Sequence, residues 1–249
     1  MDAPVALVTG AGRGIGAAIA AELAGRGHRI AVCDLDGAAA FDMAGALAER
    51  HCVKTAAITA DISDSAAARA AVLEADADLG PVDVLVNNAA VDVVGRFVDS
   101  DEQSWDRIIA VNLRGTIAMT RAVLDGMIER ERGRIIHIAS DAGRVGSSGE
   151  VVYSATKGGI IAFGKALARE VARHGITVNS VCPGPTETAL LGQVAEYSQR
   201  MYEATVRAIP LRRVAQPGDI AGVVGFLASD AAAYLTGQTI SVSGGLTML

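Results

Sequence analysis

The chain has 249 residues and a formal net charge of −6, from 22 lysines and arginines against 28 aspartates and glutamates. A chain of this length can bury a large core without disulfide support, and a hydrophobic content of 51% excludes an intrinsically disordered polymer. The acidic balance and the 4% aromatic content argue against nucleic-acid binding, which needs a positive surface to contact phosphates.

The sequence carries no sign of export, membrane insertion or a metal centre. Its three cysteines form no C-x-x-C pair, and its four histidines form no H-x-x-x-H pattern. No apolar run reaches the ~18 residues of a transmembrane helix, and residues 1–4 lack the basic start of a signal peptide. We therefore expect a cytoplasmic protein with no membrane partner, no disulfide framework and no bound metal.

Short apolar runs rich in β-branched residues alternate with longer, Ala-rich stretches. The runs read as strands that are covered on both faces, and they span residues 5–9, 30–34, 55–59, 82–87, 134–139, 176–181 and 239–242. The stretches predict helices over residues 15–26, 38–50, 66–76, 105–131, 153–174 and 218–227, with Gly27 and Gly175 where two of them end. This alternation predicts one α/β domain over residues 1–249, with a doubly wound parallel sheet of about seven strands and helices on both faces.

The first predicted strand runs into a glycine-rich turn, and a helix follows. Residues 9–16 read T-G-A-G-R-G-I-G. Glycines let the backbone turn tightly, and the free N–H groups and dipole of a helix N-terminus attract a pyrophosphate. The strict G-x-G-x-x-G pattern is not met, because Ile15 stands three residues after Gly12. We predict a dinucleotide site here; a plain tight loop is the alternative.

The second predicted strand ends at Asp34, 18 residues after Gly16. A carboxylate at this point can accept hydrogen bonds from both ribose hydroxyls of the adenosine, and it repels a 2′-phosphate. Leu35 and Asp36 follow it, so that Arg13 is the nearby cation. We therefore expect NAD in preference to NADP; the alternative is a solvated loop aspartate.

Tyr153 and Lys157 are spaced i and i+4, on one face of a predicted helix. A free phenol has a pKa of about 10, and the ammonium of a neighbouring lysine or the charge of an oxidised nicotinamide favours its phenolate. Such a tyrosine can accept a proton from an alcohol or donate one to a ketone. Ser140 follows the strand predicted over 134–139, at the sheet edge where ligands bind. Asn112 falls inside a predicted helix, where asparagine is unfavourable.

These motifs, together with residues 87–90 and Pro183-Gly184, resemble in order and spacing the motif set of the short-chain dehydrogenase/reductase family, over essentially the whole chain. The resemblance implies a Rossmann-type fold and a homotetramer. It implies that Tyr153 transfers the proton, that Lys157 lowers the pKa of Tyr153 and holds the nicotinamide ribose, that Ser140 positions the substrate oxygen, and that Asn112 anchors a water for proton relay. The departure is Ala90, where the family usually has glycine.

The same resemblance implies a set of cofactor-binding residues. Asp61 and Ile62 would contact the adenine, Asn88 and Ala89 the adenosine ribose, and the residues after Pro183 the carboxamide. The full set is Gly10, Arg13, Gly14, Ile15, Gly16, Asp34, Asp61, Ile62, Asn88, Ala89, Tyr153, Lys157, Pro183, Gly184, Thr186 and Thr188.

Residues 140–150 lie between the two catalytic elements and are expected on the substrate side. With residues 182–191, 208–211 and 241–248, they resemble 2-hydroxycyclohexanecarboxyl-CoA dehydrogenases, which oxidise a β-hydroxyacyl-CoA with NAD. We therefore expect an acyl-CoA substrate, which Ser140, Asp141, Arg144 and Tyr153 would contact. Guanidinium groups suit the phosphates of coenzyme A, and the candidates are Arg144, Arg207, Arg212 and Arg213; solvated surface charges are the alternative reading.

The segment over residues 183–217 is the one sizeable stretch without a predicted strand late in the chain. We expect it to form a mobile substrate lid, around residues 186–215. Three other functions stay open: a 3-oxoacyl thioester reductase, a sugar or cyclic-alcohol dehydrogenase, and a non-catalytic dinucleotide-binding scaffold on the same fold.

Overall fold

Seven parallel strands form one sheet in the computed structural model, which describes residues 3–249. Residues 1 and 2, part of the segment considered for a signal peptide, lie outside this range. The strands are β1 (Val5–Thr9), β2 (Arg29–Asp34), β3 (Thr55–Thr59), β4 (Val82–Asn87), β5 (Gly133–Ile138), β6 (Ile176–Pro183) and β7 (Thr239–Val242). Their order is β3-β2-β1-β4-β5-β6-β7. The predicted α/β fold is confirmed, with strand ends that differ from the expected ones by one or two residues.

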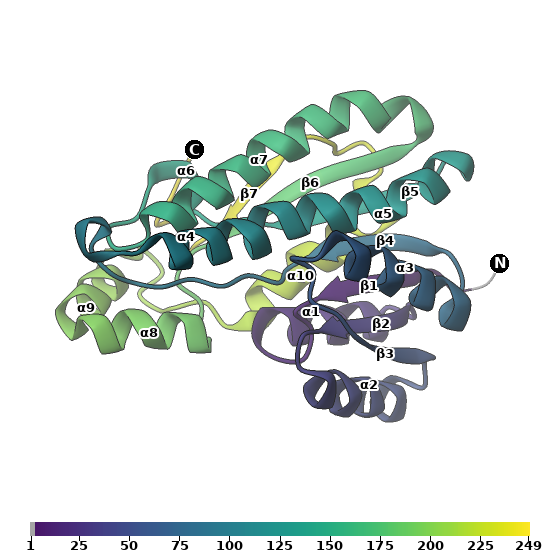
Figure 1. Ribbon diagram of the computed structural model, residues 1–249, viewed down its shortest axis with the longest axis horizontal. Coiled ribbons are helices and arrows are strands. Elements are labelled where there is room, and N and C mark those ends of the chain that lie inside the picture. The colour runs from purple at the N-terminus through teal and green to yellow at the C-terminus, as the bar shows by residue number, and fades with distance from the viewer. Residues whose placement is uncertain (1–2) are drawn as a thin grey trace.

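Helices cover both faces of the sheet (Figure 1). One face carries α1 (Gly14–Gly25), α2 (Gly37–His51) and α10 (Pro217–Leu227), and the other carries α3 (Ser65–Leu79), α5 (Thr116–Glu129) and α7 (Val151–Val171). Successive residues of a strand point to opposite faces. Leu7 and Leu85 therefore enter the core under α3, α5 and α7, whereas Val8 and Val86 enter the core under α1, α2 and α10. The central strands β1, β2, β4, β5 and β6 are buried on both sides, which explains their continuous apolar character.

Successive strands extend the sheet in one direction from β1 to β3 and in the opposite direction from β4 to β7. β1 and β4 therefore lie side by side, although two strands separate them in sequence. At such a switch point the loops after the two strands diverge to opposite faces and leave a crevice at the carboxyl edge of the sheet. The loops after β1 and β4 are the ones that carry the glycine-rich turn and Asn88. The fold thus places the predicted dinucleotide turn at this crevice.

The stretch over residues 105–131 is not the single α-helix that we expected. It consists of α4 (Glu102–Ile108), a π-helical segment η2 (Ile109–Gly115) and α5. A π-helical turn holds about one residue more than an α-helical turn, so it changes which side chains share a face. Asn112 lies in the middle of this segment.

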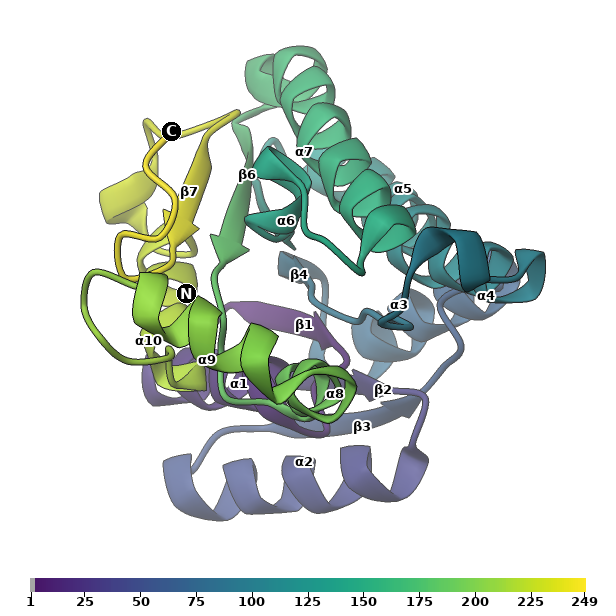
Figure 2. The ribbon, with the colours of Figure 1, turned by 90° about the vertical axis from the view of Figure 1, so that its left-hand side faces the viewer.

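The segment after β6 folds into two helices, α8 (Ala189–Tyr197) and α9 (Gln199–Ala208), which lie across the carboxyl ends of the strands (Figure 2). An isolated parallel bridge between Thr186 and Ala215 closes this segment at its base. Neither helix contains a buried residue. Short helical pieces complete the fold: η1 (Phe97–Asp99), α6 (Ala142–Val145), η3 (Ala172–His174) and η4 (Asp230–Ala232). No helix in the described part of the chain combines the length and the apolar composition of a bilayer crossing.

Candidate active site

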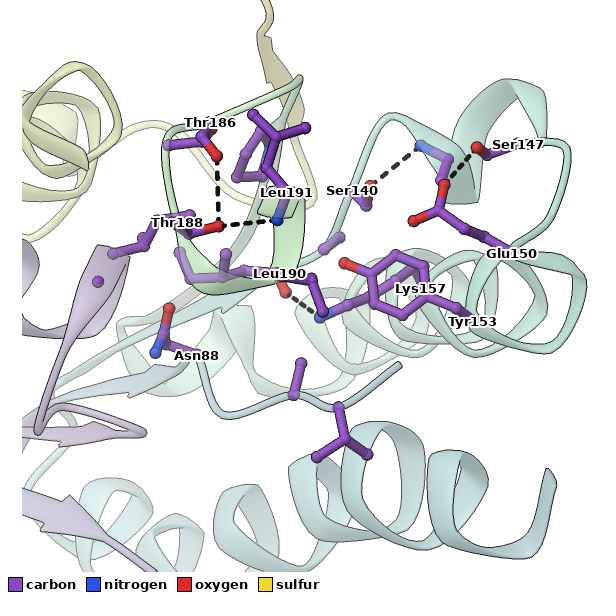
Figure 3. A pocket seen from close by; sticks show the side chains of 18 of the residues that line it. Asn88, Ser140, Ser147, Glu150, Tyr153, Lys157, Thr186, Thr188, Leu190 and Leu191 are labelled. Carbon is purple, nitrogen blue, oxygen red and sulfur yellow. Dashed lines mark hydrogen bonds between the residues drawn. The ribbon is translucent and has the colours of Figure 1, made fainter. Parts of the chain in front are cut away.

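A cavity of about 1430 Å³ lies at the carboxyl edge of the sheet, between the strand ends and the segment that contains α8 and α9 (Figure 3). Nearly every residue predicted for the site lines it: Gly10, Arg13, Gly14, Ile15, Asp34, Asp61, Ile62, Asn88, Ala89, Ser140, Asp141, Tyr153, Lys157, Pro183, Gly184, Thr186 and Thr188. The fold thus brings residues from the ends of six strands, β1 to β6, and from α7 to one space. Gly16, Asn112 and Arg144 are the predicted site residues that lie outside its lining.

The glycine-rich turn leaves open space at the N-terminus of α1. Gly10 and Gly14 have positive φ angles of 62° and 59°, which side chains disfavour. A Cβ atom on Gly16 would overlap the carbonyl oxygen of Gly10 and lie 2.5 Å from Nδ2 of Asn88. No side chain caps the N-terminus of α1, so its first N–H groups are available to an anion. This part of the cavity fits the phosphates of a dinucleotide.

Asn88 and Thr9 join the loop after β4 to the end of β1. The Nδ2 atom of Asn88 donates to the carbonyl oxygens of Thr9 and Gly10, at 2.9 and 3.0 Å. In return, the Thr9 hydroxyl accepts the N–H groups of Asn88 and Ala89, at 3.0 and 3.1 Å. This reciprocal set fixes the spacing of the two loops at the switch point. The family resemblance implies a position near the ribose for Asn88, but it does not imply these hydrogen bonds to Thr9 and Gly10.

Asp34 is buried at the end of β2, with one oxygen accepting the N–H of Gly12 at 2.9 Å and the other accepting the N–H of Asp36 at 3.0 Å. The carboxylate thus links the glycine-rich turn to the loop that begins α2. It also lines the cavity. Each carboxylate oxygen keeps a further lone pair for a ligand hydroxyl, so this position fits the adenosine ribose of a dinucleotide.

Tyr153 and Lys157 lie one turn apart in α7 and are both buried. Nζ of Lys157 donates to the carbonyl oxygen of Ile138 at 2.7 Å and lies 5.5 Å from the centroid of the Tyr153 ring. The Ser140 side chain lies next to the phenol and acts to lower its pKa. Ser140 Oγ also accepts the N–H of Ala142 at 3.1 Å, which fixes the start of α6. Figure 3 shows the Tyr153 hydroxyl pointing into the cavity between Ser140 and Lys157.

Burial governs the protonation of this pair. It raises the pKa of the Tyr153 phenol above its ordinary value; the Glu150 carboxylate adds to this rise, and the neighbouring Ser140 side chain opposes it. Burial also lowers the pKa of Lys157 to about 8, although Cys182 and Asp92 act in the opposite direction. In the chain by itself the neutral phenol is therefore favoured. A further positive charge next to the ring would shift Tyr153 toward the phenolate.

Asn112 is fully buried, and its carboxamide pairs with the backbone of Val91. Its Oδ1 accepts the N–H of Val91 at 2.8 Å, and its Nδ2 donates to the C=O of Val91 at 2.9 Å. The Nδ2 atom also reaches the Thr156 hydroxyl at 3.4 Å. Asn112 thus holds the loop after β4, which lines the cavity, against α7. Its unfavourable position in a helix is explained by this pairing.

Arg144 is directed to the C-terminal segment. Its Nη1 donates to the Ser241 hydroxyl at 2.7 Å, and its Nη2 donates to the carbonyl oxygen of Leu249. The Ser241 hydroxyl in turn donates to the buried carboxylate of Asp141, which does line the cavity. Arg144 therefore supports Asp141 through Ser241.

The other arginines considered for coenzyme A also lie outside the lining. Arg213 forms an ion pair with Asp219 at 2.6 Å, and Arg207 forms one with Glu203 at 3.6 Å. Arg212 donates to the backbone oxygen of Arg207. These contacts fit the reading of these arginines as surface charges with partners in the chain.

Several lining residues were not foreseen from the sequence. Arg107 and Val111 are two of them, and they reach the cavity from α4 and η2. Glu150 also lines the cavity, and it belongs to residues 140–150, which were expected on the substrate side. Gly143 is needed for close packing, because a Cβ atom there would lie 2.6 Å from the backbone of α7 at Gly158. The glycines of α7 were a signal for such packing, but the sequence did not show which segment they contact.

Comparisons with known proteins agree with this geometry. A family model described as enoyl-(acyl carrier protein) reductase matches residues 10–247. A (3R)-3-hydroxyacyl-CoA dehydrogenase of Mus musculus is 41% identical over 98% of this chain and 96% of its own length. An acetoacetyl-CoA reductase of Shinella zoogloeoides is 40% identical over 97% of each chain, and a 3-oxoacyl-(acyl-carrier-protein) reductase of Staphylococcus aureus is 40% identical over 98% of each. With the glycine-rich turn, the switch-point crevice and the Ser140, Tyr153 and Lys157 side chains in one cavity, these matches show that the chain belongs to the short-chain dehydrogenase/reductase family.

Proposed function

We propose that this chain is an NAD-dependent oxidoreductase that interconverts a secondary alcohol and a ketone. The observation that carries the proposal is the position of the Tyr153 phenol. It lies between Ser140 and Lys157 in the same cavity as the glycine-rich turn and Asp34. A proton-transfer group thus stands in the space that also fits a dinucleotide.

Each of these side chains has a distinct task in alcohol oxidation. The Ser140 hydroxyl holds the substrate oxygen next to the Tyr153 phenolate, which accepts the hydroxyl proton. Lys157, fixed by its hydrogen bond to Ile138, keeps a positive charge close to the ring of Tyr153. A nicotinamide, when bound, supplies the hydride acceptor and a further positive charge. In ketone reduction, Tyr153 donates the proton that it accepts in oxidation.

Asp34 supports a preference for NAD over NADP. It is buried, and its two oxygens are held in place by backbone N–H groups. A 2′-phosphate at this point would meet a fixed negative charge that cannot swing away. The residues that follow it, Leu35 and Asp36, offer no cation to compensate.

The substrate side of the cavity supports a β-hydroxyacyl thioester, such as 2-hydroxycyclohexanecarboxyl-CoA. Apolar side chains of α8 and α9 line it, among them Leu190, Leu191, Val194 and Met201. Such a wall suits a hydrocarbon chain or ring. The relatives named above are a 3-hydroxyacyl-CoA dehydrogenase, an acetoacetyl-CoA reductase and a 3-oxoacyl-(acyl-carrier-protein) reductase. All three names describe an acyl thioester with a hydroxyl or keto group at its β-carbon.

The names of two relatives favour a second candidate, a 3-oxoacyl thioester reductase. The two candidates differ in cofactor and in direction. A reductase driven by NADPH would work against the Asp34 carboxylate, so Asp34 favours the NAD-linked dehydrogenase.

The test is a screen of the purified protein for NADH formation, read at 340 nm. The panel contains β-hydroxyacyl-CoAs of several chain lengths, 2-hydroxycyclohexanecarboxyl-CoA, free cyclic alcohols and sugars, each with NAD and with NADP. We expect turnover with NAD and a hydroxyacyl-CoA. Turnover with free alcohols alone would overturn the thioester class, and binding of NAD with no turnover on any alcohol or ketone would favour the scaffold reading.

Three further expectations complete the proposal. We propose that the protein is a homotetramer in the cytoplasm, and that α8 and α9 close over bound substrate. Sedimentation equilibrium tests the tetramer. Hydrogen exchange of residues 189–208, slower with bound substrate than without it, is the expected sign of closure.

A further inference from the structure

A buried carboxylate lies behind the wall of the catalytic cavity and has no role in the function proposed above. Asp92 follows the cavity-lining residues after β4 and is 8% exposed. Neither of its oxygens has a hydrogen-bond partner within the described residues; the N–H of Val93 approaches it without completing a hydrogen bond. An ionised carboxylate in such a place is costly unless a partner satisfies it.

The carboxyl group that faces Asp92 is that of Glu150. The two are close enough for a hydrogen bond once either of them carries a proton. The loops that hold them are joined, because the N–H of Gly95 donates to the carbonyl oxygen of Gly149 at 2.9 Å. The Ser147 hydroxyl donates to the far side of Glu150. Figure 3 shows Glu150 extending from the segment before α7 toward the cavity, on the side of Tyr153.

A carboxylate that faces a second carboxylate is harder to ionise, because like charges repel. Burial raises the pKa of Asp92 to about 7; the Val93 N–H and Lys157 act against this rise, and the Glu150 carboxylate adds to it. Asp92 therefore carries a proton below neutral pH and loses it as the pH rises through about 7. Glu150 is the member that lines the catalytic cavity.

We propose that Asp92 is a positioning residue: its protonated carboxyl group donates a hydrogen bond to Glu150, holds that carboxylate next to Tyr153 and limits the negative charge there to one. Loss of this proton places a second negative charge near Tyr153 and disfavours its phenolate. The pair thus sets the pH range in which Tyr153 accepts a proton. This rests on the proposed function, in which Tyr153 is the base of alcohol oxidation.

The surroundings of the pair make this reading specific. The titratable groups that face it are Tyr153 and Lys157 of α7 and, beyond them, Cys182 of β6. The other side chains around the small hollow beside Asp92 come from η1, α4 and the start of α7 and do not titrate: Val93, Phe97, Ser100, Ser104, Trp105, Ile108, Val151 and Val152. The charge of Asp92 therefore acts on both members of the catalytic pair, Tyr153 and Lys157.

The experiment compares Asp92→Asn with Asp92→Ala. Asparagine keeps a donor toward Glu150 and cannot ionise, whereas alanine keeps neither property. In the pH profile of kcat/KM for alcohol oxidation, we expect Asp92→Asn to move the ascending limb to lower pH by about half a unit or more. We expect kcat of Asp92→Ala to be about fivefold lower than kcat of Asp92→Asn, because alanine cannot form the hydrogen bond to Glu150. A limb that stays in place in Asp92→Asn, or equal turnover of the two variants, would overturn the proposal.

A second readout does not depend on turnover. Folding raises the pKa of Asp92 from 3.8 to about 7, so the folded state binds a proton more tightly than the unfolded state does. The urea midpoint of the wild type should therefore fall relative to that of Asp92→Asn as the pH rises from 4 to 7. Asp42→Asn, which changes an exposed aspartate of α2, should show no such trend. A constant difference between wild type and Asp92→Asn would overturn the pair itself. If the pH-dependent difference in urea midpoint is found but the protein oxidises no alcohol, the interaction between Asp92 and Glu150 is supported and the proposed function is rejected.

Discussion

The side chain of Asn112 pairs with the backbone of Val91 as a neighbouring strand would, accepting from its N–H at 2.8 Å and donating to its C=O at 2.9 Å. The N–H and C=O groups of Val91, in the loop after β4, thereby find hydrogen-bond partners although no neighbouring strand pairs with this loop. Because this loop lines the cavity, the π-helical segment that carries Asn112 is part of the support of the site.

Replacing Asn112 by alanine should destabilise the fold by about 2–4 kcal/mol, because both polar groups of Val91 lose their partner. Urea unfolding followed by circular dichroism measures this change. Asn112→Asp, which keeps the acceptor for the Val91 N–H, should lie between the wild type and the alanine variant. An alanine variant as stable as the wild type would show that the pairing contributes nothing.

Replacing Tyr153 by phenylalanine should lower kcat by a factor of at least ~100, because it removes the hydroxyl that we propose to transfer the proton. NAD should still bind, as measured by titration calorimetry, since the change leaves the glycine-rich turn intact. Tyr234→Phe is the matched control, because this tyrosine is fully exposed. Near-normal turnover of Tyr153→Phe would remove Tyr153 from the mechanism.

Replacing Asp34 by asparagine should reduce the preference for NAD over NADP by about tenfold or more, because the 2′-phosphate no longer meets a negative charge. The ratio of kcat/KM for the two cofactors measures the change. Asp36→Asn is the control: Asp36 caps α2 by accepting the N–H of Ala39, and asparagine caps equally well. An unaltered ratio in Asp34→Asn would assign the preference to another residue.

Replacing Gly16 by alanine should destabilise the protein by about 3 kcal/mol and weaken NAD binding, because the added methyl group would press on the backbone of Gly10 and on Asn88. Gly45→Ala in α2 tests the same change where nothing lies within 4 Å, and it should stabilise the helix by about 0.5–1 kcal/mol. Thermal unfolding compares the two. Equal effects of the two variants would contradict the close packing of the turn.

The sheet was predictable because its central strands are buried on both faces and so stand out as apolar runs. Site residues such as Ser140 were predictable because each directly follows a strand, and all parallel strands end at the same edge. The π-helical segment could not be predicted, because one added residue per turn barely changes the spacing of apolar residues in a short helix. Arg144 contacts Ser241, 97 residues away, and the burial of Asp92 arises from tertiary packing. Both the Arg144–Ser241 contact and the burial of Asp92 depend on which distant segments pack together. The local sequence pattern does not show which segments these are.

The two helices that close one side of the cavity, α8 and α9, contain no buried residue. Substitutions there cost the fold little, since the free energy of folding comes from the two cores around the sheet. Residues 189–208 can therefore be exchanged as a cassette while the catalytic side chains keep their geometry. Selection, in nature or in the laboratory, should be able to change what this enzyme accepts at little cost in stability.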